Sequence, residues 1–289
     1  MIVSLFAEME PTILLCSDLD RTILPNGEPP ESRQARPRLR RLAARPEVML
    51  AYVSGRHQRL LRDAINEYAI PTPDYAIGDV GTTIYEIDGS QWRPLVEWGA
   101  AIAPDWANAQ HADLAALFSD LDVLRLQEPE KQNTYKLSYY APPTLEYEDL
   151  LGEMEARLRS REIRASLIWS IDEAVGTGLL DVLPANATKR HAIEFLMERH
   201  DFDSAHTVFA GDSGNDLPVV ESGAMKSVLV RNAHPAVITA ARRALTDRGA
   251  LQMLYVARGG FLGMNGNYSA GVLEGLVHFR PEAAAWLRE

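Results

Sequence analysis

Short apolar runs alternate with amphipathic segments in the first and last thirds of the chain. Amphipathic segments occupy residues 31–45, 57–70, 188–200 and 235–244, and the apolar runs between them begin at Thr12, Val48, Asp74, His206 and Lys226. Short apolar strands separated by amphipathic helices are typical of crossover connections in a parallel sheet. The pattern therefore predicts an α/β protein whose core is a doubly wound, Rossmann-like parallel sheet.

The middle third has a different pattern. It contains a hairpin-like segment, TTIYEIDGSQWRPL, with Asp88-Gly89 at its turn, then alternating helical and strand patterns up to about residue 182. An Asp-Gly pair between two alternating runs is a strong hairpin signal. We predict a core domain formed by residues 1–86 and 183–289 and an inserted α+β cap domain formed by residues 87–182. Such an insert is expected to lie over the carboxyl ends of the core strands, where parallel sheets bind ligands.

Composition narrows the class of protein. The 289 residues are 46% apolar, which suffices for a sizeable core, and the net charge of -11 argues against a nucleic-acid partner, which clustered basic residues would be needed to bind. The single cysteine, Cys16, excludes an internal disulfide and a cysteine metal cluster, so we expect a cytoplasmic protein. The first ten residues lack a basic start and do not resemble a signal peptide, and no apolar run approaches the roughly 18 residues of a membrane span.

Two carboxylates follow the first apolar strand. Asp18 and Asp20 lie at and just past its carboxyl end, so both can point into one cavity. One such acid can stay ionised beside a cation while the other moves a proton to and from a leaving oxygen. The alternative is a solvated acidic loop or a helix cap.

Two further segments offer groups that suit a phosphate. Ser54-Gly55-Arg56 ends a second apolar strand directly before a helix, where a hydroxyl and free amides can bind phosphate oxygens, although an ordinary serine cap has the same sequence. Lys189 stands in the first turn of a predicted helix, where its charge opposes the helix dipole unless an anion is near. Its neighbour Arg190 is the competing candidate.

The most specific local signal is VFAGDSGNDLPVV, which begins at Val208. A strand is followed by a tight turn and a helix, and this spacing lets Asp212 and Asp216 approach one ion. The alternative is a turn in which Asp216 only favours the helix dipole. All four segments end a strand or open a helix, so a parallel sheet would gather them at one edge, with a cation and Lys189 providing positive charge.

In this order, DLDRT, SGR, Lys189 and GDSGND resemble the four motifs of the haloacid dehalogenase superfamily of phosphotransferases. The insert resembles the type IIB cap of that superfamily. Four longer stretches, PDYAIGDVGTTIY, EKQNTYKLSYY, LDVLPANATKRHAIEFL and NYSAGVLEGLVHF, resemble sucrose-6-phosphate phosphatases, and mannosylfructose-phosphate phosphatases share the same layout. The resemblance covers nearly the whole chain.

The resemblance implies roles for the motif residues. Asp18 would be the nucleophile and Asp20 the general acid and base, with Ser54, Gly55, Lys189 and Asn215 holding the phosphate. Asp18, the Asp20 carbonyl and Asp212 would ligate Mg²⁺, supported by Asp216. The sequence departs from the family pattern at Arg21, where Gly or Asn is common, at Ser54, where Thr is common, and at Gly178-Leu179, where polar sugar contacts are expected.

Candidate sugar ligands in the cap are the polar residues Glu130, Gln132, Asn133, Lys136 and Asp181, since a ligand with many hydroxyls needs several donors and acceptors. Lys136, Ser138 and Tyr140 alternate along a strand, however, and would also suit a solvated face. We interpret Tyr139 and Trp169 as cap core and His57 and His191 as surface residues.

The sequence therefore predicts a Mg²⁺-dependent phosphatase that hydrolyses a phosphorylated sugar, with sucrose-6-phosphate as the first candidate, through an aspartyl-phosphate. Mannosylfructose-phosphate or another sugar phosphate is the alternative substrate. A phosphomutase and a non-catalytic sugar-phosphate sensor are the alternatives from other classes. We expect a monomer without membrane or nucleic-acid partners, and the resemblance leaves room for association with a sugar-phosphate synthase.

Overall fold

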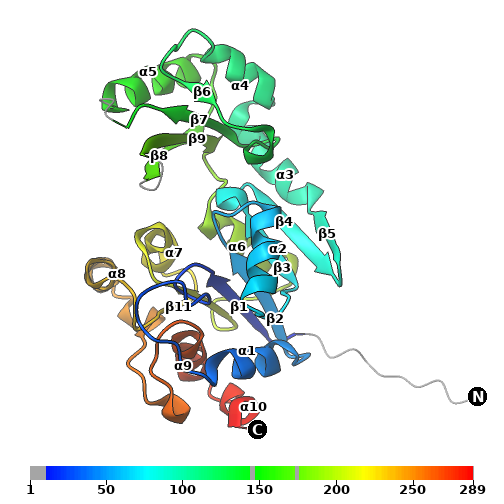
Figure 1. Cartoon of the computed structure of the whole chain (residues 1–289), viewed down its shortest axis with the longest axis vertical. Coiled ribbons are helices and arrows are strands. Elements are labelled where there is room, and N and C mark those ends of the chain that lie inside the picture. The colour runs from blue at the N-terminus through cyan, green and yellow to red at the C-terminus, as the bar shows by residue number, and fades with distance from the viewer. Residues whose placement is uncertain (1–10, 144–146, 173–175, 289) are drawn as a thin grey trace, which may run out of the picture.

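The structure, a computed structural model, describes residues 11–143, 147–172 and 176–288. In the described part of the chain two sheets form, one of eight strands in the lower half of the molecule and one of four strands in the upper half (Figure 1). The predicted absence of a signal peptide concerns residues 1–10, which lie outside the described residues. No described helix is long and apolar enough to span a membrane.

The large sheet has the order β12-β11-β10-β1-β2-β3-β4-β5. Its strands are β1 (Ile13–Asp18), β2 (Val48–Val53), β3 (Tyr75–Gly78), β4 (Thr83–Asp88), β5 (Gln91–Pro94), β10 (Thr207–Gly211), β11 (Lys226–Leu229) and β12 (Leu254–Val256). The six strands from β12 to β3 pair in parallel, and β4 and β5 add antiparallel at one edge. This architecture confirms the predicted α/β class.

Helices cover both faces of the large sheet. One face packs against α1 (Ala35–Ala43), α2 (Gln58–Glu67), α9 (Ser269–Phe279) and α10 (Ala283–Arg288). The other packs against α3 (Val96–Ile102), α6 (Lys189–Arg199), α7 (Leu217–Ser222) and α8 (Pro235–Asp247). Strands β1 and β2 are buried along their whole length, as expected for a sheet covered on both sides.

The upper half is an antiparallel sheet covered by helices on one face. Its order is β6-β7-β9-β8, formed by β6 (Arg125–Leu126), β7 (Leu137–Ala141), β9 (Thr177–Pro184) and β8 (Ala165–Asp172). The helices α4 (His111–Leu117) and α5 (Tyr147–Ser160) pack on one face through Leu114, Met154 and Leu158. Tyr139 is buried in this cluster and Trp169 packs against it, so both belong to the cap core, as predicted. The other face of the sheet looks toward the large sheet (Figure 1).

The β4-β5 hairpin lies on the large sheet, which differs from its predicted place in the insert. The Asp88-Gly89 turn forms as expected, with Asp88 paired to Gln91, but β4 also pairs with β3 from Tyr75 to Gly78. Apolar side chains explain this position, because Ile84 is fully buried in the core cluster. A division at residue 87 would cut this hairpin, so the hydrogen bonding favours a core segment that continues to Pro94.

The carboxyl ends of the central strands carry the predicted motifs. Asp18 ends β1, Ser54 follows β2, and Asp212 follows β10. Strand β1 lies between β2 and β10, so the chain leaves β1 toward one side and returns on the other. Open α/β sheets bind ligands at such a switch point, beyond the carboxyl ends of the strands.

The chain passes from the core to the cap and back again, and a buried carboxylate joins these two connecting segments. Asp105 lies in η2 (Ala103–Trp106) on the outgoing segment and is 1% exposed. Its Oδ2 accepts a hydrogen bond of 2.6 Å from the backbone N–H of Asn186 on the returning segment. Its other carboxylate oxygen pairs with the guanidinium of Arg164.

Candidate active site

Lys189 joins the predicted nucleophile to the fourth motif. Its Nζ lies 2.7 Å from Asp18 Oδ1 and 2.7 Å from Asp216 Oδ1, and also donates to Asn215 Oδ1 at 3.1 Å. Burial alone would lower the pKa of Lys189, but the charges of Asp18 and Asp216 outweigh it and raise that pKa above its usual value. The lysine therefore stays charged, and its place in the first turn of α6 is explained by the anions beside it.

The fourth motif forms a tight turn around the Asp216 carboxylate. Its Oδ2 accepts hydrogen bonds from the backbone N–H groups of Asp212 and Ser213, at 3.0 and 3.1 Å. Gly211 is required for this approach, because a Cβ there would lie 2.6 Å from the carboxylate of Asp216. Thr22 from the first motif donates to Asp212 Oδ1 at 3.2 Å, so the turn is held from both sides.

Three carboxylates meet at this point. Asp18, Asp212 and Asp216 each offer an oxygen, and these atoms all lie within 4.8 Å of one another. Burial and the neighbouring charge of Asp216 raise the pKa of Asp212 to about 6, and burial, partly offset by Lys189, raises the pKa of Asp18 to about 7. Clustered carboxylate oxygens with an excess of negative charge fit a hard divalent cation such as Mg²⁺.

Asp20 lies at the edge of this cluster and contacts the second motif. Arg56 donates to it from Nη2 at 2.6 Å and from Nε at 2.9 Å, and Asn26 Nδ2 donates to it at 2.7 Å. Burial favours the protonated acid, but the hydrogen bonds and charge of Arg56 outweigh this effect and lower the pKa of Asp20. The first and second motifs are thus linked through the predicted proton-transfer residue.

The remaining phosphate candidates lie around the cluster with different exposure. Ser54 is buried, and its Oγ accepts a hydrogen bond of 3.2 Å from the Arg56 N–H. Gly55 and Asn215 are exposed. Lys189 and Asn215 are in direct contact, whereas no hydrogen bond among the described residues joins Ser54 to either of them.

The cap candidates divide into two groups. Lys136 Nζ donates to Ser138 Oγ at 2.8 Å and lies 3.3 Å from Asp181 Oδ1, and Glu130 is exposed. The Gln132 amide instead binds its own loop, because its Nε2 donates to the carbonyls of Gln127 and Ser138.

Asn133 is also engaged. Its Nδ2 donates to Thr82 Oγ1 of the core at 2.8 Å, and its Oδ1 accepts from the Tyr135 N–H at 2.8 Å. The structure thus brings Lys136, directly before β7, close to Asp181 on β9, and uses Gln132 and Asn133 to hold the loop that precedes β7.

Comparison with known proteins identifies the family. The family model described as "Sucrose-6F-phosphate phosphohydrolase" matches residues 11–280, nearly the whole chain. The chain belongs to this family. The phosphatase is therefore a hydrolase of the haloacid dehalogenase superfamily, as its four motifs predicted.

Three relatives illustrate the likeness. The phosphatase is 60% identical over 279 residues to a "Putative HAD-like hydrolase" of Nitrosococcus oceani. The aligned region covers 96% of this chain and 75% of that protein. It is 28% identical over 276 residues to a mannosylfructose-phosphate phosphatase of Agrobacterium fabrum, covering 94% and 98%. A crystal structure of the sucrose-phosphatase of a Synechocystis species with sucrose and phosphate superposes with a TM-score of 0.68 at 26% identity, covering 93% and 98%.

Several residues that shape the phosphatase site were not singled out from the sequence. Asn26 bridges the first motif, because it binds Asp20 and its Oδ1 accepts from the Arg21 N–H at 2.8 Å. Asn232 donates to the Arg21 carbonyl at 2.6 Å. Arg21 itself has a φ of 60°, a backbone conformation that Gly and Asn adopt more readily, which accounts for the Gly or Asn expected at this position but not for the Arg.

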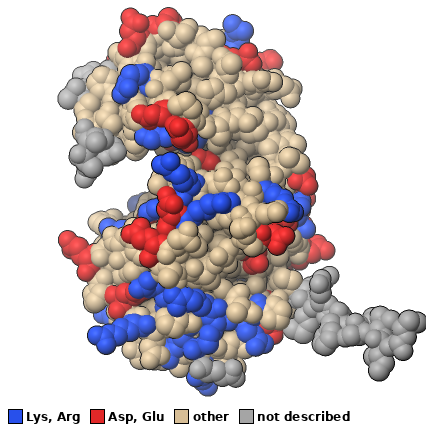
Figure 2. Space-filling model, turned by 45° about the vertical axis from the view of Figure 1, so that its right-hand side comes forward, with Lys and Arg blue, Asp and Glu red and all other residues tan. Residues whose placement is uncertain are grey.

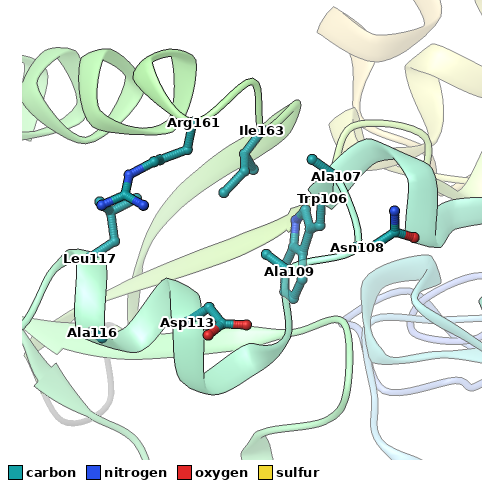
Figure 3. A pocket seen from close by; sticks show the side chains of 9 residues that line it. All are labelled: Trp106, Ala107, Asn108, Ala109, Asp113, Ala116, Leu117, Arg161 and Ile163. Atoms are coloured by element: carbon teal, nitrogen blue, oxygen red, sulfur yellow. The ribbon is translucent and has the colours of Figure 1, made fainter.

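The molecule is hollowed between the cap and the core, with basic and acidic side chains on both sides of the opening (Figure 2). A second concavity, of about 610 Å³, lies within the cap beside Trp106, Asp113 and Arg161 (Figure 3). None of the four motifs contributes to its lining. The motifs gather instead at the carboxyl ends of β1, β2 and β10.

Proposed function

We propose that this phosphatase hydrolyses a phosphorylated sugar in a Mg²⁺-dependent reaction, with sucrose-6-phosphate as its substrate and Asp18 as its nucleophile. The observation that carries the proposal is the contact of Lys189 with Asp18 and Asp216, at 2.7 Å each. It places one buried cation between a candidate nucleophile and a candidate metal ligand. Relatives named for sucrose-phosphate and mannosylfructose-phosphate support a sugar substrate.

In the first step Asp18 attacks phosphorus. One carboxylate oxygen of Asp18 forms a bond to phosphorus while the bond from phosphorus to the sugar oxygen breaks, which gives an aspartyl-phosphate. Asp20, which must first take up a proton because Arg56 favours its ionised form, donates that proton to the departing sugar oxygen. Lys189, which already binds Asp18, and Ser54 bind the equatorial phosphate oxygens and stabilise their charge.

In the second step water hydrolyses the aspartyl-phosphate. Asp20 now accepts the proton of the attacking water, the bond between phosphorus and Asp18 breaks, and phosphate leaves. Asp18, the Asp20 carbonyl and Asp212 would hold Mg²⁺, with Asp216 supporting them, and the bound ion would neutralise phosphate and carboxylate charge.

The cap binds the sugar in this proposal. Lys136, directly before β7, forms a hydrogen-bonded group with Ser138 on β7 and Asp181 on β9, and this group offers both a donor and an acceptor. Glu130 is exposed nearby in sequence and adds a second carboxylate. We further propose that the enzyme works as a cytoplasmic monomer, with a sugar-phosphate synthase as its candidate partner.

The test is release of inorganic phosphate from sucrose-6-phosphate, mannosylfructose-phosphate and simple hexose phosphates, measured with Mg²⁺ and after thorough chelation. We expect turnover that requires the metal and is fastest with sucrose-6-phosphate. Asp18→Asn should lower kcat by at least about a thousandfold, since it removes the nucleophile. Near-normal turnover by this variant, or full activity without divalent metal, would refute the mechanism.

Other outcomes separate the alternatives. Preference for mannosylfructose-phosphate would keep the mechanism and change the substrate. Phosphate retained on the sugar, without release to solution, would indicate a phosphomutase. Binding of sugar phosphate without any turnover would indicate a sensor.

A further inference from the structure

Asp79 is a buried carboxylate that the four motifs leave unused. It follows β3 at the carboxyl edge of the large sheet, and 6% of its surface is exposed. Its backbone N–H donates to the carbonyl of Arg56 at 3.0 Å, so it lies beside the second motif. This position is one strand away from the predicted phosphate contacts, on the side where the cap is attached.

The turn that carries Asp79 is held from several directions. Asp79 and Val80 have φ values of 52° and 61°, and such left-handed conformations at non-glycine residues persist where surrounding contacts enforce them. Trp98 Nε1 donates to the Gly81 carbonyl at 3.0 Å. A Cβ on Gly81 would lie 3.1 Å from the backbone nitrogen of Lys189, so the turn packs on the start of α6. The carboxylate of Asp79 is therefore presented on a fixed support.

Groups from the core and the cap surround this carboxylate. The hydroxyl of Tyr85 lies 3.5 Å from Asp79 Oδ2. Burial raises the pKa of Asp79, and the charges of Lys136 from the cap and His57 from the core offset part of that rise. Among the described residues Asp79 forms no ion pair, so no charged side chain neutralises it at contact distance.

We propose that Asp79 is a specificity-determining residue that accepts a hydrogen bond from a hydroxyl of the sugar leaving group, opposite Lys136 of the cap. An ionised carboxylate offers only acceptors and sugar hydroxyls are donors, so the two groups match. The residue contacts the backbone of the second motif and is close enough to Lys136 of the cap to be affected by its charge. This inference rests on the proposed sugar phosphatase function.

The experiment compares two substrates with different leaving groups. Sucrose-6-phosphate carries sugar hydroxyls, whereas p-nitrophenyl phosphate has none. Asp79→Asn keeps the size and shape of the side chain, and Asn tolerates a left-handed backbone. Asp79→Gly removes the side chain without backbone strain. We expect kcat/KM for sucrose-6-phosphate to fall about 10- to 100-fold in both variants, and kcat/KM for p-nitrophenyl phosphate to change less than about twofold.

Controls distinguish binding from support of the fold. Asp88→Asn removes an exposed carboxylate from the turn of the neighbouring hairpin and should change neither substrate. Equal losses on both substrates would overturn the proposal and assign Asp79 to support of Lys189 instead. Unchanged kcat/KM on both substrates would also overturn it. A wild-type enzyme that hydrolyses p-nitrophenyl phosphate but no sugar phosphate would refute the proposed function, and this inference with it.

Discussion

Arg56 donates hydrogen bonds to both carboxylate oxygens of Asp20, from Nη2 to Oδ1 at 2.6 Å and from Nε to Oδ2 at 2.9 Å. The contact joins the loop after β1 to the loop after β2 and fixes the side chain that the mechanism requires for proton transfer. Two-point contacts of this kind set orientation as well as charge. In this position Asp20 is held in its ionised form, which is the form that acts as base in the second step, and it must be protonated before it acts as acid in the first.

A double-mutant cycle with Asp20→Asn and Arg56→Met should give a coupling free energy of about 0.5–1 kcal/mol at neutral pH, because Asp20 is 41% exposed and solvent screens the pair. Arg56 lowers the pKa of Asp20 in the folded protein, despite the opposing effect of burial. The coupling is therefore fully present above the pKa that Asp20 has in the unfolded chain, and it is lost as the pH falls through the lower pKa that Asp20 has in the folded protein. Urea unfolding of chelated protein across acidic pH measures it. A coupling that did not change with pH would contradict this account.

Lys189→Met should destabilise the metal-free protein by about 3–5 kcal/mol at pH near 8, because two carboxylates lose their buried cation. Burial already raises the pKa of Asp18 to about 7, and loss of Lys189 raises it further. The folded variant then binds more protons than the unfolded chain, so its free energy of unfolding decreases as pH rises. The matched control is Arg190→Met, which removes a partly exposed pair with Glu194 worth about 0.3–0.5 kcal/mol. Equal losses in the two variants would be evidence against a buried charge cluster.

Mg²⁺ should raise the midpoint of thermal unfolding, and more strongly near pH 8 than near pH 5. The ion competes with protons, because burial raises the pKa of Asp18 to about 7 and that of Asp212 to about 6. A metal concentration of about 100 times Kd would add about 2.7 kcal/mol to the free energy of unfolding. Asp212→Asn should abolish most of the shift, while Asp203→Asn, at an exposed site, should retain it. A shift of the unfolding midpoint that did not depend on pH would indicate that Mg²⁺ binds away from Asp18 and Asp212.

Gln132→Ala should lower the free energy of unfolding by about 1–3 kcal/mol, since it leaves the backbone N–H of the buried residue Ser138 on β7 without its acceptor. Glu130→Ala is the matched control on the same loop and should change stability by less than about 0.5 kcal/mol, because Glu130 is exposed. Urea unfolding gives both values. If Glu130→Ala alone changes KM for the sugar phosphate, Glu130 binds the sugar and Gln132 only shapes the loop. The opposite pattern would reverse these roles.

The core motifs were accessible from sequence because their signals are local. Lys189 was singled out by its unfavourable place in a first helical turn, and the structure supplies the two carboxylates that resolve the conflict. The turn from Gly211 to Asp216 was predictable from its glycines and aspartates. Parallel strands bring their carboxyl ends to one edge, so the gathering of Asp18, Asp212 and Lys189 followed from the element order alone.

Long-range partners were not accessible in the same way. The Asp88-Gly89 turn predicted a hairpin, but nothing local to it showed that β4 would pair with β3 rather than join the cap sheet. The SGR segment left Ser54 open between a phosphate contact and an ordinary serine cap, and nothing local to it indicated that Arg56 would bind Asp20, which is 36 positions away. Gln132 and Asn133 had the polarity of sugar ligands, yet their amides are used by backbone carbonyls and by Thr82.

The Asp105 carboxylate joins the two segments that connect the cap to the core, so that movement of one is coupled to movement of the other. It binds the backbone of Asn186 on one connection from its own place on the other, so the two cannot bend independently above that point. Rotation of the cap would then occur about the short segments between the Asp105–Asn186 contact and the core. One of these segments runs from Asn186 to Lys189 within three residues. Opening and closing over a sugar would in this way be transmitted to the lysine that holds the nucleophile.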